Sequence, residues 1–243
     1  MTHSRSNRSV VGALTLLAVL SVPIAAAAQD LKPIDLPKPQ ISGGMPLMEA
    51  LSARRTTREF GPEKLPAQML SDLLWAAFGI NRADMPGRAG QTGRTAPSGM
   101  NMQEIDLYIA FPEGVYLYEA KPHRLVPVVA KDVRAMTNGR PAAGEAPLCI
   151  IFVEDQDKRP TMPAKPLAAG TPRAGAPPAG APRSTAGEVD CGFIGQNVYL
   201  FCASAGLNAW FYGTNRDGIH EALKLRPGQK VLFGQAVGYP KKS

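Results

Sequence analysis

The stretch from Asp190 to Gly206 constrains the fold most, because its pattern predicts a long helix that is apolar on nearly every side. Along one side, apolar residues recur at spacings of three and four: Ile194, Val198, Phe201 and Ala205. Further apolar residues cover the rest of its surface: Phe193, Leu200 and Cys202. A helix of this kind lies inside a protein. Asp190 is the expected N-cap and Gly206 the expected end, and the remaining chain must surround the helix.

Two other helices are predicted upstream and one downstream of this segment. The first upstream helix runs from Pro46 to about Arg54. The second begins at Pro66, which suits a first turn, and ends at Gly79, which suits a C-terminal cap. Its apolar residues follow helical spacing: Leu70, Leu73, Leu74, Ala77 and Phe78. The downstream helix is short and is expected over 217–223.

Alternating or continuously apolar runs predict the strands, over 105–109, 115–118, 148–153, 209–212 and 231–237. The first two are joined by a Pro-Glu-Gly turn and are expected to form a hairpin. The run 148–153 is apolar throughout, as expected of a strand that is covered on both faces. Helices and strands mix without strict alternation, so the predicted class is α+β, with a sheet wrapped by helices.

Residues 1–28 are expected to be a secretory leader. Arg5 and Arg8 precede an apolar run that ends in four alanines, and cleavage after Ala28 satisfies the small-residue rule. An uncleaved membrane anchor is the alternative. The two arginines are not adjacent, so we expect a Sec-type signal, export in the unfolded state and a periplasmic location. No later stretch is long and apolar enough to span a bilayer.

The remaining chain is expected to form an extended, proline-rich arm over 29–44 and one domain over 45–243. The apolar fraction of 44% and the charged fraction of 19% are typical of a globular protein. Residues 158–186 are a Pro/Ala/Gly-rich insertion whose composition cannot bury a core. This insertion is either a cover over a nearby site or an inert addition to the surface.

Charge and cysteine patterns exclude two classes of site. The formal net charge is +7, but no run of lysine and arginine alternates with aromatic residues, so nucleic acid is not an expected partner. The cysteines, Cys149, Cys191 and Cys202, lie in apolar surroundings and form neither a C-x-x-C pair nor a cluster with histidine. We therefore expect buried small apolar residues and assign no metal site.

The first candidate site is a basic cluster at the end of the first predicted helix: Arg54, Arg55, Thr56 and Arg58. Guanidinium groups match phosphate oxygens in pairs and a hydroxyl adds a donor, so the expected ligand is a phosphomonoester. A solvated basic turn is the alternative. Lys241 and Lys242 follow the last predicted strand and either add two cations to this site or form a solvated tail.

The second candidate site is the polar stretch 97–103, which precedes a predicted strand. Ser98 offers a hydroxyl, and Asn101 and Gln103 offer side-chain amides. Such groups can serve a heterocycle that presents both donors and acceptors, because an amide carries both. An ordinary loop is the alternative.

Four segments, in this order, resemble motifs of the FMN-dependent nitroreductase family. Residues 54–60, R-R-T-T-R-E-F, are similar to its R-R-[ST]-x-R-x-F signature, and residues 94–103 resemble its R-x-x-P-S-x-x-N-x-Q segment. Residues 190–207 carry a D-x-G pair followed by Q-N-x-x-L, as in the family's central helix, and residues 237–240 read V-G-Y-P. The resemblance implies a nitroreductase-like fold with a central, mostly antiparallel sheet and an obligate homodimer.

The resemblance also implies roles for individual residues. The FMN phosphate and ribityl chain would be held by Arg54, Thr56 and Arg58, with Arg55 beside them and Lys241 or Lys242 completing the site. The flavin would be met from the partner subunit by Pro97, Ser98, Asn101 and Gln103. Gly213 or its neighbour Tyr212 would correspond to the backbone that approaches flavin N5, in an aromatic segment that would narrow the substrate pocket.

In this family the flavin performs the redox chemistry, and the resemblance implies a ping-pong reaction that reduces a nitro-aromatic, a quinone or a similar planar acceptor. Residues 79–82 and 114–118 are closest to the branch that includes the peptide-azoline dehydrogenases, which makes a flavin-dependent dehydrogenase of a peptide or modified amino acid the first alternative. A flavin-binding protein without turnover is the second. NAD(P)H, the family's usual donor, is scarce outside the cytoplasm, so another protein or a quinol is expected to replace it.

Overall fold

The computed structural model describes residues 31–87, 90–158 and 185–242. Its strands are β1 (Ile34–Asp35), β2 (Ile80–Arg82), β3 (Gly93–Arg94), β4 (Ile105–Phe111), β5 (Gly114–Glu119), β6 (Arg124–Val129), β7 (Leu148–Asp155), β8 (Asn208–Gly213) and β9 (Gln229–Gly238). Within the described residues, seven of these form one sheet in the order β1-β6-β5-β4-β7-β9-β8, and each neighbouring pair is antiparallel. The α+β class with a central antiparallel sheet is confirmed.

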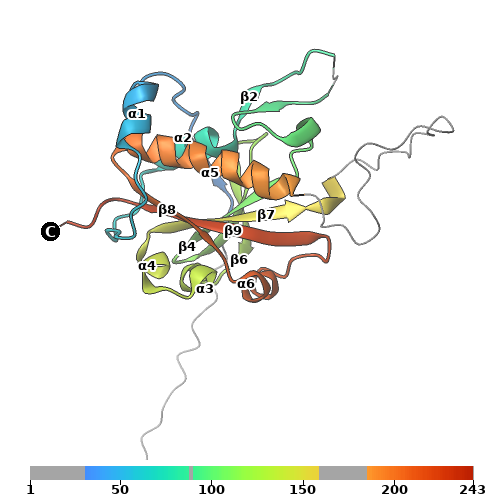
Figure 1. Ribbon diagram of the computed structural model, residues 1–243. Coiled ribbons are helices and arrows are strands. Elements are labelled where there is room, and N and C mark those ends of the chain that lie inside the picture. The colour runs from blue at the N-terminus through green and yellow to red at the C-terminus, as the bar shows by residue number, and fades with distance from the viewer. Residues whose placement is uncertain (1–30, 88–89, 159–184, 243) are drawn as a thin grey trace, which may run out of the picture.

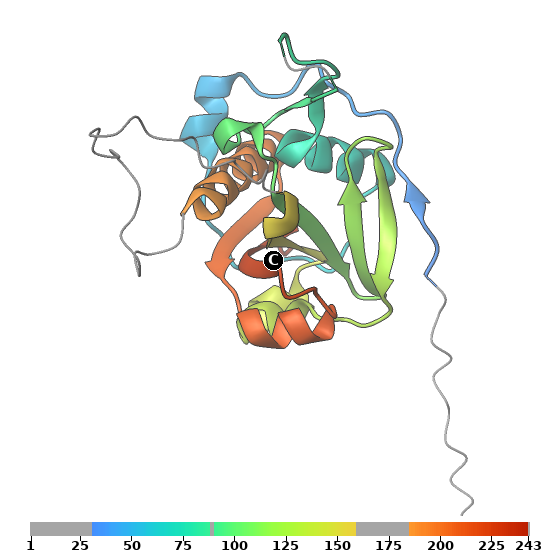
Figure 2. The same ribbon diagram turned by 90° about the vertical axis from the view of Figure 1, so that its right-hand side faces the viewer.

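Helices cover both faces of this sheet (Figures 1 and 2). The helices are α1 (Leu47–Ala53), α2 (Ala67–Phe78), α3 (Arg134–Asn138), α4 (Pro141–Glu145), α5 (Ala186–Ala205) and α6 (Arg216–Ala222), with short 3₁₀ turns at Gly99–Asn101 and Gln156–Lys158. Helices α2 and α5 pack on one face in one apolar cluster, whereas α3, α4 and α6 pack on the other face in a second cluster. Strands β2 and β3 form a separate small sheet.

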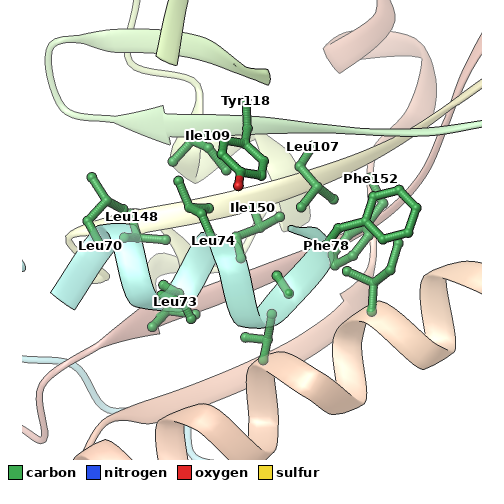
Figure 3. Packing of buried hydrophobic residues seen from close by; sticks show 14 of the residues in the cluster. Leu70, Leu73, Leu74, Phe78, Leu107, Ile109, Tyr118, Leu148, Ile150 and Phe152 are labelled. Carbon is green, nitrogen blue, oxygen red and sulfur yellow. The ribbon is translucent and has the colours of Figure 1, made fainter. Parts of the chain in front are cut away.

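Helix α2 confirms its predicted boundaries and its apolar face. Pro66 precedes it and Gly79 follows it, where an added Cβ would lie 2.4 Å from Trp75 Cδ1, so a side chain does not fit there. Figure 3 shows the apolar side chains of α2 directed at the sheet. The residues in this contact are Leu70, Leu73, Leu74 and Phe78 of α2, Leu107 and Ile109 of β4, and Leu148, Ile150 and Phe152 of β7.

Strand β7 is buried along its whole length, as its continuous apolar run predicts. It pairs with β4 on one side and β9 on the other, and helices cover both of its faces. The cysteines, Cys149, Cys191 and Cys202, are buried, as expected, and they are also unpaired, which the sequence left open. Burial raises the pKa of the Cys149 thiol to about 11, so this group stays protonated at neutral pH.

Helix α5 begins earlier than predicted. It starts at Ala186, so Asp190 is not its N-cap; this prediction is wrong because the helix continues for a further turn toward the N-terminus. Asp190 is 2% exposed, and its Oδ1 accepts the backbone N–H of Gly99 at 3.4 Å. Gly206 ends the helix as predicted, with a φ of 69° that glycine adopts without strain.

Helix α5 is also not covered on every side. Val189 and Phe193 are 50% and 44% exposed, so the expectation of complete burial is wrong for the single chain. The sheet and α2 cover only part of the circumference of this helix, and its outward side exposes Glu188 and Gln196 as well as Val189 and Phe193.

The described part of the N-terminal arm lies along the sheet edge and then across α2. Ile34 and Asp35 pair with β6, and the hydroxyl of Ser71 on α2 donates to the carbonyl oxygen of Pro37 at 2.6 Å. The predicted leader, and all but the ends of the insertion 158–186, lie outside the described residues, so both stay predictions. Among the residues that the structure describes, no helix is long and apolar enough to cross a membrane.

The sequence patterns missed several short elements, namely β1, β2, β3, β6, α3 and α4. Strand β6 contains Pro127, which lacks the N–H of a regular strand residue, so its pattern does not indicate a strand. The helix predicted over 217–223 and the strands predicted over 209–212 and 231–237 are confirmed with slightly different ends.

Candidate functional site

The basic cluster lies along the outer edge of β8, directly after α1. The backbone N–H of Thr57 donates to the carbonyl oxygen of Ala209 at 3.0 Å, so this segment runs beside the strand. Arg54 and Thr56 lie beside Tyr199 on the α5 side of this edge, whereas Arg58 lies over Trp210, whose ring packs in the cluster on the other face of the sheet. We call Arg54, Thr56 and Arg58 the clamp.

Aromatic rings position both arginines of the clamp. The Cζ atom of Arg54 lies 5.4 Å from the centre of the Tyr199 ring, and that of Arg58 lies 5.3 Å from the Trp210 ring. Stacking of this kind is favourable and leaves the N–H edge of a guanidinium group open to an anion. Among the described residues, no ion pair joins either arginine to a carboxylate. The clamp therefore keeps its positive charge for a ligand.

Hydroxyl groups accompany these cations. Thr56 Oγ1 lies 3.0 Å from Tyr199 Oη, which also accepts the backbone N–H of Phe211 at 2.8 Å. The next hydroxyl, Thr57 Oγ1, is buried and has no hydrogen-bond partner within the described part of the chain. It lines a cavity of about 240 Å³ together with Asn208. Arg55 also lines this cavity, so Thr57 lies apart from the clamp, and the hydroxyl of Thr56 beside the guanidinium group of Arg54 is the pair of donors that suits phosphate oxygens.

Arg55 has a different role from the clamp residues. Its Nη1 donates to the carbonyl oxygens of Ser52 at 2.6 Å and of Arg54 at 2.9 Å. These carbonyls belong to the C-terminal end of α1, where a cation is stabilised. Arg55 therefore caps α1 and adds only nearby charge to the predicted site.

The C-terminal tail lies beside the segment that follows the clamp. The backbone N–H of Gly61 donates to the carbonyl oxygen of Tyr239 at 2.8 Å. Lys242 Nζ lies 2.8 Å from Glu63 Oε1, and this hydrogen bond lowers the pKa of Glu63. Of the two predicted lysines, Lys242 is thus engaged by a carboxylate, whereas Lys241 forms no ion pair with a described residue.

The second predicted site is a loop held by its own side chains. Ser98 Oγ accepts the backbone N–H of Gln103 at 2.8 Å. The side-chain amide of Gln103 accepts from Arg94 Nε at 2.7 Å and donates to the carbonyl oxygen of Thr92 at 2.6 Å. Asn101 Nδ2 donates to the same carbonyl at 3.1 Å. Both amides predicted to meet a heterocycle therefore bind their own chain here.

This hydrogen-bond network fixes a strained backbone. Met100, Asn101 and Gln103 have φ angles of 51°, 58° and 53°, which residues other than glycine rarely adopt. Strain of this kind persists only where the surrounding structure imposes it, and it is concentrated at functional sites. The loop therefore has a fixed shape that its sequence alone does not favour.

The loop and the clamp lie beside different parts of α5. The loop contacts Asp190 and the clamp contacts Tyr199, nine residues later, which is about 13 Å along the helix axis. In Figure 1, α1 lies near the end of α5 that leads into β8, and β2 lies toward the other end. A single chain therefore does not bring the clamp together with the loop, which carries the exposed Pro97 and the half-buried Ser98.

The side chain of Tyr212 lies in the core between β8 and α3. Its hydroxyl is 2.7 Å from Thr137 Oγ1 and 3.4 Å from Cys149 Sγ, and burial raises the pKa of Tyr212. This side chain is not available to a ligand. Gly213 is exposed at the end of β8, and its N–H points the same way as that of Phe211, away from β9, because directions alternate along a strand. The predicted backbone contact at Gly213 stays a prediction.

The sequence reasoning missed two residues that shape the site. Tyr199 is the only tyrosine of α5, and a phenol hydroxyl within an apolar helix requires a hydrogen-bond partner. This requirement is the feature of the sequence that could have identified Tyr199 as a site residue. Trp210 was expected only to narrow a pocket, whereas it supports Arg58.

The model of the nitroreductase family matches residues 51–239 of this chain. The chain belongs to the nitroreductase family. A crystal structure described as that of a nitroreductase from Ralstonia eutropha JMP134 is 35% identical, covers 94% of this chain and 98% of its own, and has a TM-score of 0.73. The protein MJ1384 of Methanocaldococcus jannaschii, which also carries the name of a nitroreductase, is 26% identical over 192 residues, 77% of this chain and 88% of that protein.

More distant relatives share the fold of the nitroreductase family. The NADPH:FMN oxidoreductase from Vibrio harveyi, in complex with NAD⁺, is 18% identical, with a TM-score of 0.52 and coverage of 81% of this chain and 69% of its own. At this identity the likeness concerns the fold alone. The nitroreductase-like fold predicted from the motifs is confirmed.

We predict that the clamp, and not Arg55, retains FMN. Each hydrogen bond to a charged group contributes about 1.5–3 kcal/mol, so losing both Arg54 and Arg58 weakens binding by at least about two orders of magnitude. The double variant Arg54→Ala with Arg58→Ala should lose its flavin absorbance on dialysis. Arg55→Ala is a matched control from the same segment and should keep its flavin. Equal loss of flavin from the double variant and from Arg55→Ala would contradict this assignment.

Proposed function

We propose that this protein is an FMN-dependent oxidoreductase that passes electrons to a planar acceptor, such as a nitro-aromatic or a quinone, by a ping-pong reaction. One observation carries the proposal. The clamp holds two guanidinium groups on aromatic rings with no carboxylate partner among the described residues, and the Thr56 hydroxyl contacts the same tyrosine that supports Arg54. Such a group of donors fits a phosphate, and family membership makes a flavin phosphate the natural ligand.

The residues present fit FMN through the chemistry of these donors. Arg54, Thr56 and Arg58 would hold the phosphate, and Lys241 is the tail residue whose ammonium group is left to join them. FMN, when bound, supplies the two-electron redox chemistry. The protein contributes binding and orientation. The outward N–H of Gly213 at the edge of β8 would be the backbone donor to the ring system.

We also propose that the protein acts as a homodimer, because α1 and α5 expose an apolar surface. The large apolar residues in this surface are Leu47, Met48 and Leu51 of α1, and Val189 and Phe193 of α5, from 43% to 74% exposed. The residues of α1 lie near the end of α5 that leads into β8, and Val189 and Phe193 lie near its beginning, so exposed apolar groups occur at both ends of this helix and favour an interface along it. A groove of about 490 Å³ between the arm, α2 and α5 continues this surface, with Ile41 and Leu200 in its lining.

A two-fold dimer about α5 would also complete the site. In an interface with two-fold symmetry the same patch faces its copy, and an axis perpendicular to α5 would place the beginning of one helix near the end of the other. The strained loop lies beside the beginning of α5 and the clamp beside its second half. The loop of one subunit would then approach the clamp of its partner, as the predicted contacts of Ser98 and Asn101 require.

We further propose that the leader directs export to the periplasm, on the pattern of residues 1–28 alone. The reductant would then be a quinol or a reduced protein, because NAD(P)H is scarce there. Relationship to the peptide-azoline dehydrogenases is supported only by residues 79–82 and 114–118, which lie mainly in β2 and β5. A peptide dehydrogenase stays an alternative, and a flavin binder without turnover is the outcome that the following test distinguishes from an enzyme.

We predict that the mature protein, purified from its native compartment, carries FMN and turns it over. The visible spectrum should show bound flavin, and flavin reduced by dithionite should be reoxidised by menadione or a nitroarene faster than by air. Reoxidation by air alone would indicate a binding protein without turnover. A colourless protein that gains no flavin band when FMN is added would contradict the proposed function.

We predict that Phe193→Glu prevents dimer formation without unfolding the chain, because this side chain is already 44% exposed. FMN occupancy should fall with the loss of the dimer, since the partner's loop would no longer reach the clamp. Val128→Glu is a matched control, because Val128 is an exposed apolar residue of β6. In the sheet order β6 is next to one edge, whereas β8, the strand that follows α5, is the opposite edge. Sedimentation measures the oligomeric state, and flavin absorbance measures FMN occupancy. A Phe193→Glu dimer with full FMN occupancy would contradict this arrangement.

A further inference from the structure

Tyr199 connects three parts of the fold at the clamp. It lies on α5, its ring supports the guanidinium group of Arg54, and its hydroxyl lies 3.0 Å from Thr56 Oγ1. The same hydroxyl accepts the N–H of Phe211 on β8 at 2.8 Å. One side chain therefore contacts two of the three clamp residues and ties them to both α5 and the edge of the sheet.

The hydrogen-bond chemistry of this chain gives it a direction. A backbone N–H can only donate, so Tyr199 Oη accepts from Phe211. The phenol proton is then available to donate to Thr56 Oγ1. Thr56, having accepted this hydrogen bond, keeps its own hydroxyl proton to donate to an anion. Aligned hydrogen bonds polarise one another, so each step strengthens donation at the end of the chain.

The ring of Tyr199 acts on the second clamp residue. A guanidinium group on an aromatic face is held by the ring's negative surface while its N–H edge stays open. Arg54 makes this contact from the end of α1, where the backbone changes from helix to extended chain. The ring therefore limits the positions of a long, flexible side chain before any ligand binds, and this lowers the entropic cost of binding.

We propose that Tyr199 is a positioning residue for phosphate binding, orienting the hydroxyl of Thr56 and the guanidinium group of Arg54 without touching the ligand itself. This inference rests on the proposed function, namely that the clamp binds the FMN phosphate. It goes further by assigning the specificity for a phosphorylated flavin to a residue outside the clamp. The effect of Tyr199 is confined to the phosphate end of FMN.

The test compares FMN with riboflavin, which has the same ring system but no phosphate. Both are titrated into the full mature chain after removal of bound flavin, and the ratio of riboflavin Kd to FMN Kd measures the phosphate contribution. Tyr199→Phe keeps the ring and removes the hydroxyl. This variant should lower the ratio by about tenfold, the effect of one lost hydrogen bond, and leave the riboflavin Kd within about twofold.

A second variant examines the coupling through Thr56. Thr56→Val keeps the shape of this side chain and removes its hydroxyl. It should lower the ratio at least as much as Tyr199→Phe, and the double variant should lower it no further, because both changes interrupt the same chain of hydrogen bonds. Additive losses from the two changes would overturn the proposal, because independent contacts add.

A control variant separates this effect from a general loss of packing. Tyr118→Phe also removes a phenol hydroxyl, which lies 3.0 Å from His123 Nδ1; Tyr118 is on β5, and three strands separate β5 from β8. It should leave the ratio of riboflavin Kd to FMN Kd unchanged.

The possible outcomes distinguish the inference from the proposed function. An unchanged ratio in Tyr199→Phe, or equal weakening of FMN and riboflavin, overturns the role of Tyr199 while the wild-type preference for FMN still supports the clamp. A wild-type protein that binds riboflavin as tightly as FMN overturns the phosphate clamp, and the role of Tyr199 with it.

Discussion

The account of this site depends on how two arginines are held in place. Arg54 and Arg58 stack on Tyr199 and Trp210, and within the described chain they have no carboxylate partner. A carboxylate would also position a guanidinium group, but it would occupy the N–H edge and neutralise the charge. An aromatic face provides position without either effect. The clamp is therefore ordered by α5 and β8 and still available to an anion.

Helix α5 connects this clamp to the rest of the proposed site. Its inner side packs on the sheet, Tyr199 supports the clamp, and Asp190 contacts the strained loop. Its outer side exposes Val189 and Phe193. In a single chain this arrangement leaves two features unexplained. Apolar side chains of α5 are uncovered, and the clamp stays apart from the strained loop. The proposed two-fold dimer on this helix would explain both features together.

Sequence patterns predicted the parts of this structure that repeat a regular spacing. The boundaries of α2 and the burial of β7 follow from periodicity, and the clamp follows from its charge. The start of α5 at Ala186 and its exposed side do not, because N-caps are weak signals and the number of packing neighbours depends on the whole fold. The hydrogen bonds of Asn101 were missed for the same reason, since they join residues that come together only after folding.

The central claim is that the clamp of one subunit binds the FMN phosphate while the loop of its partner approaches the flavin. A crystal structure of the FMN-loaded mature protein tests this claim most directly. The account predicts phosphate oxygens within hydrogen-bond distance of Arg54, Thr56 and Arg58, with the other subunit's loop beside the flavin ring. A phosphate bound by other residues, or a flavin enclosed by one chain alone, would contradict it.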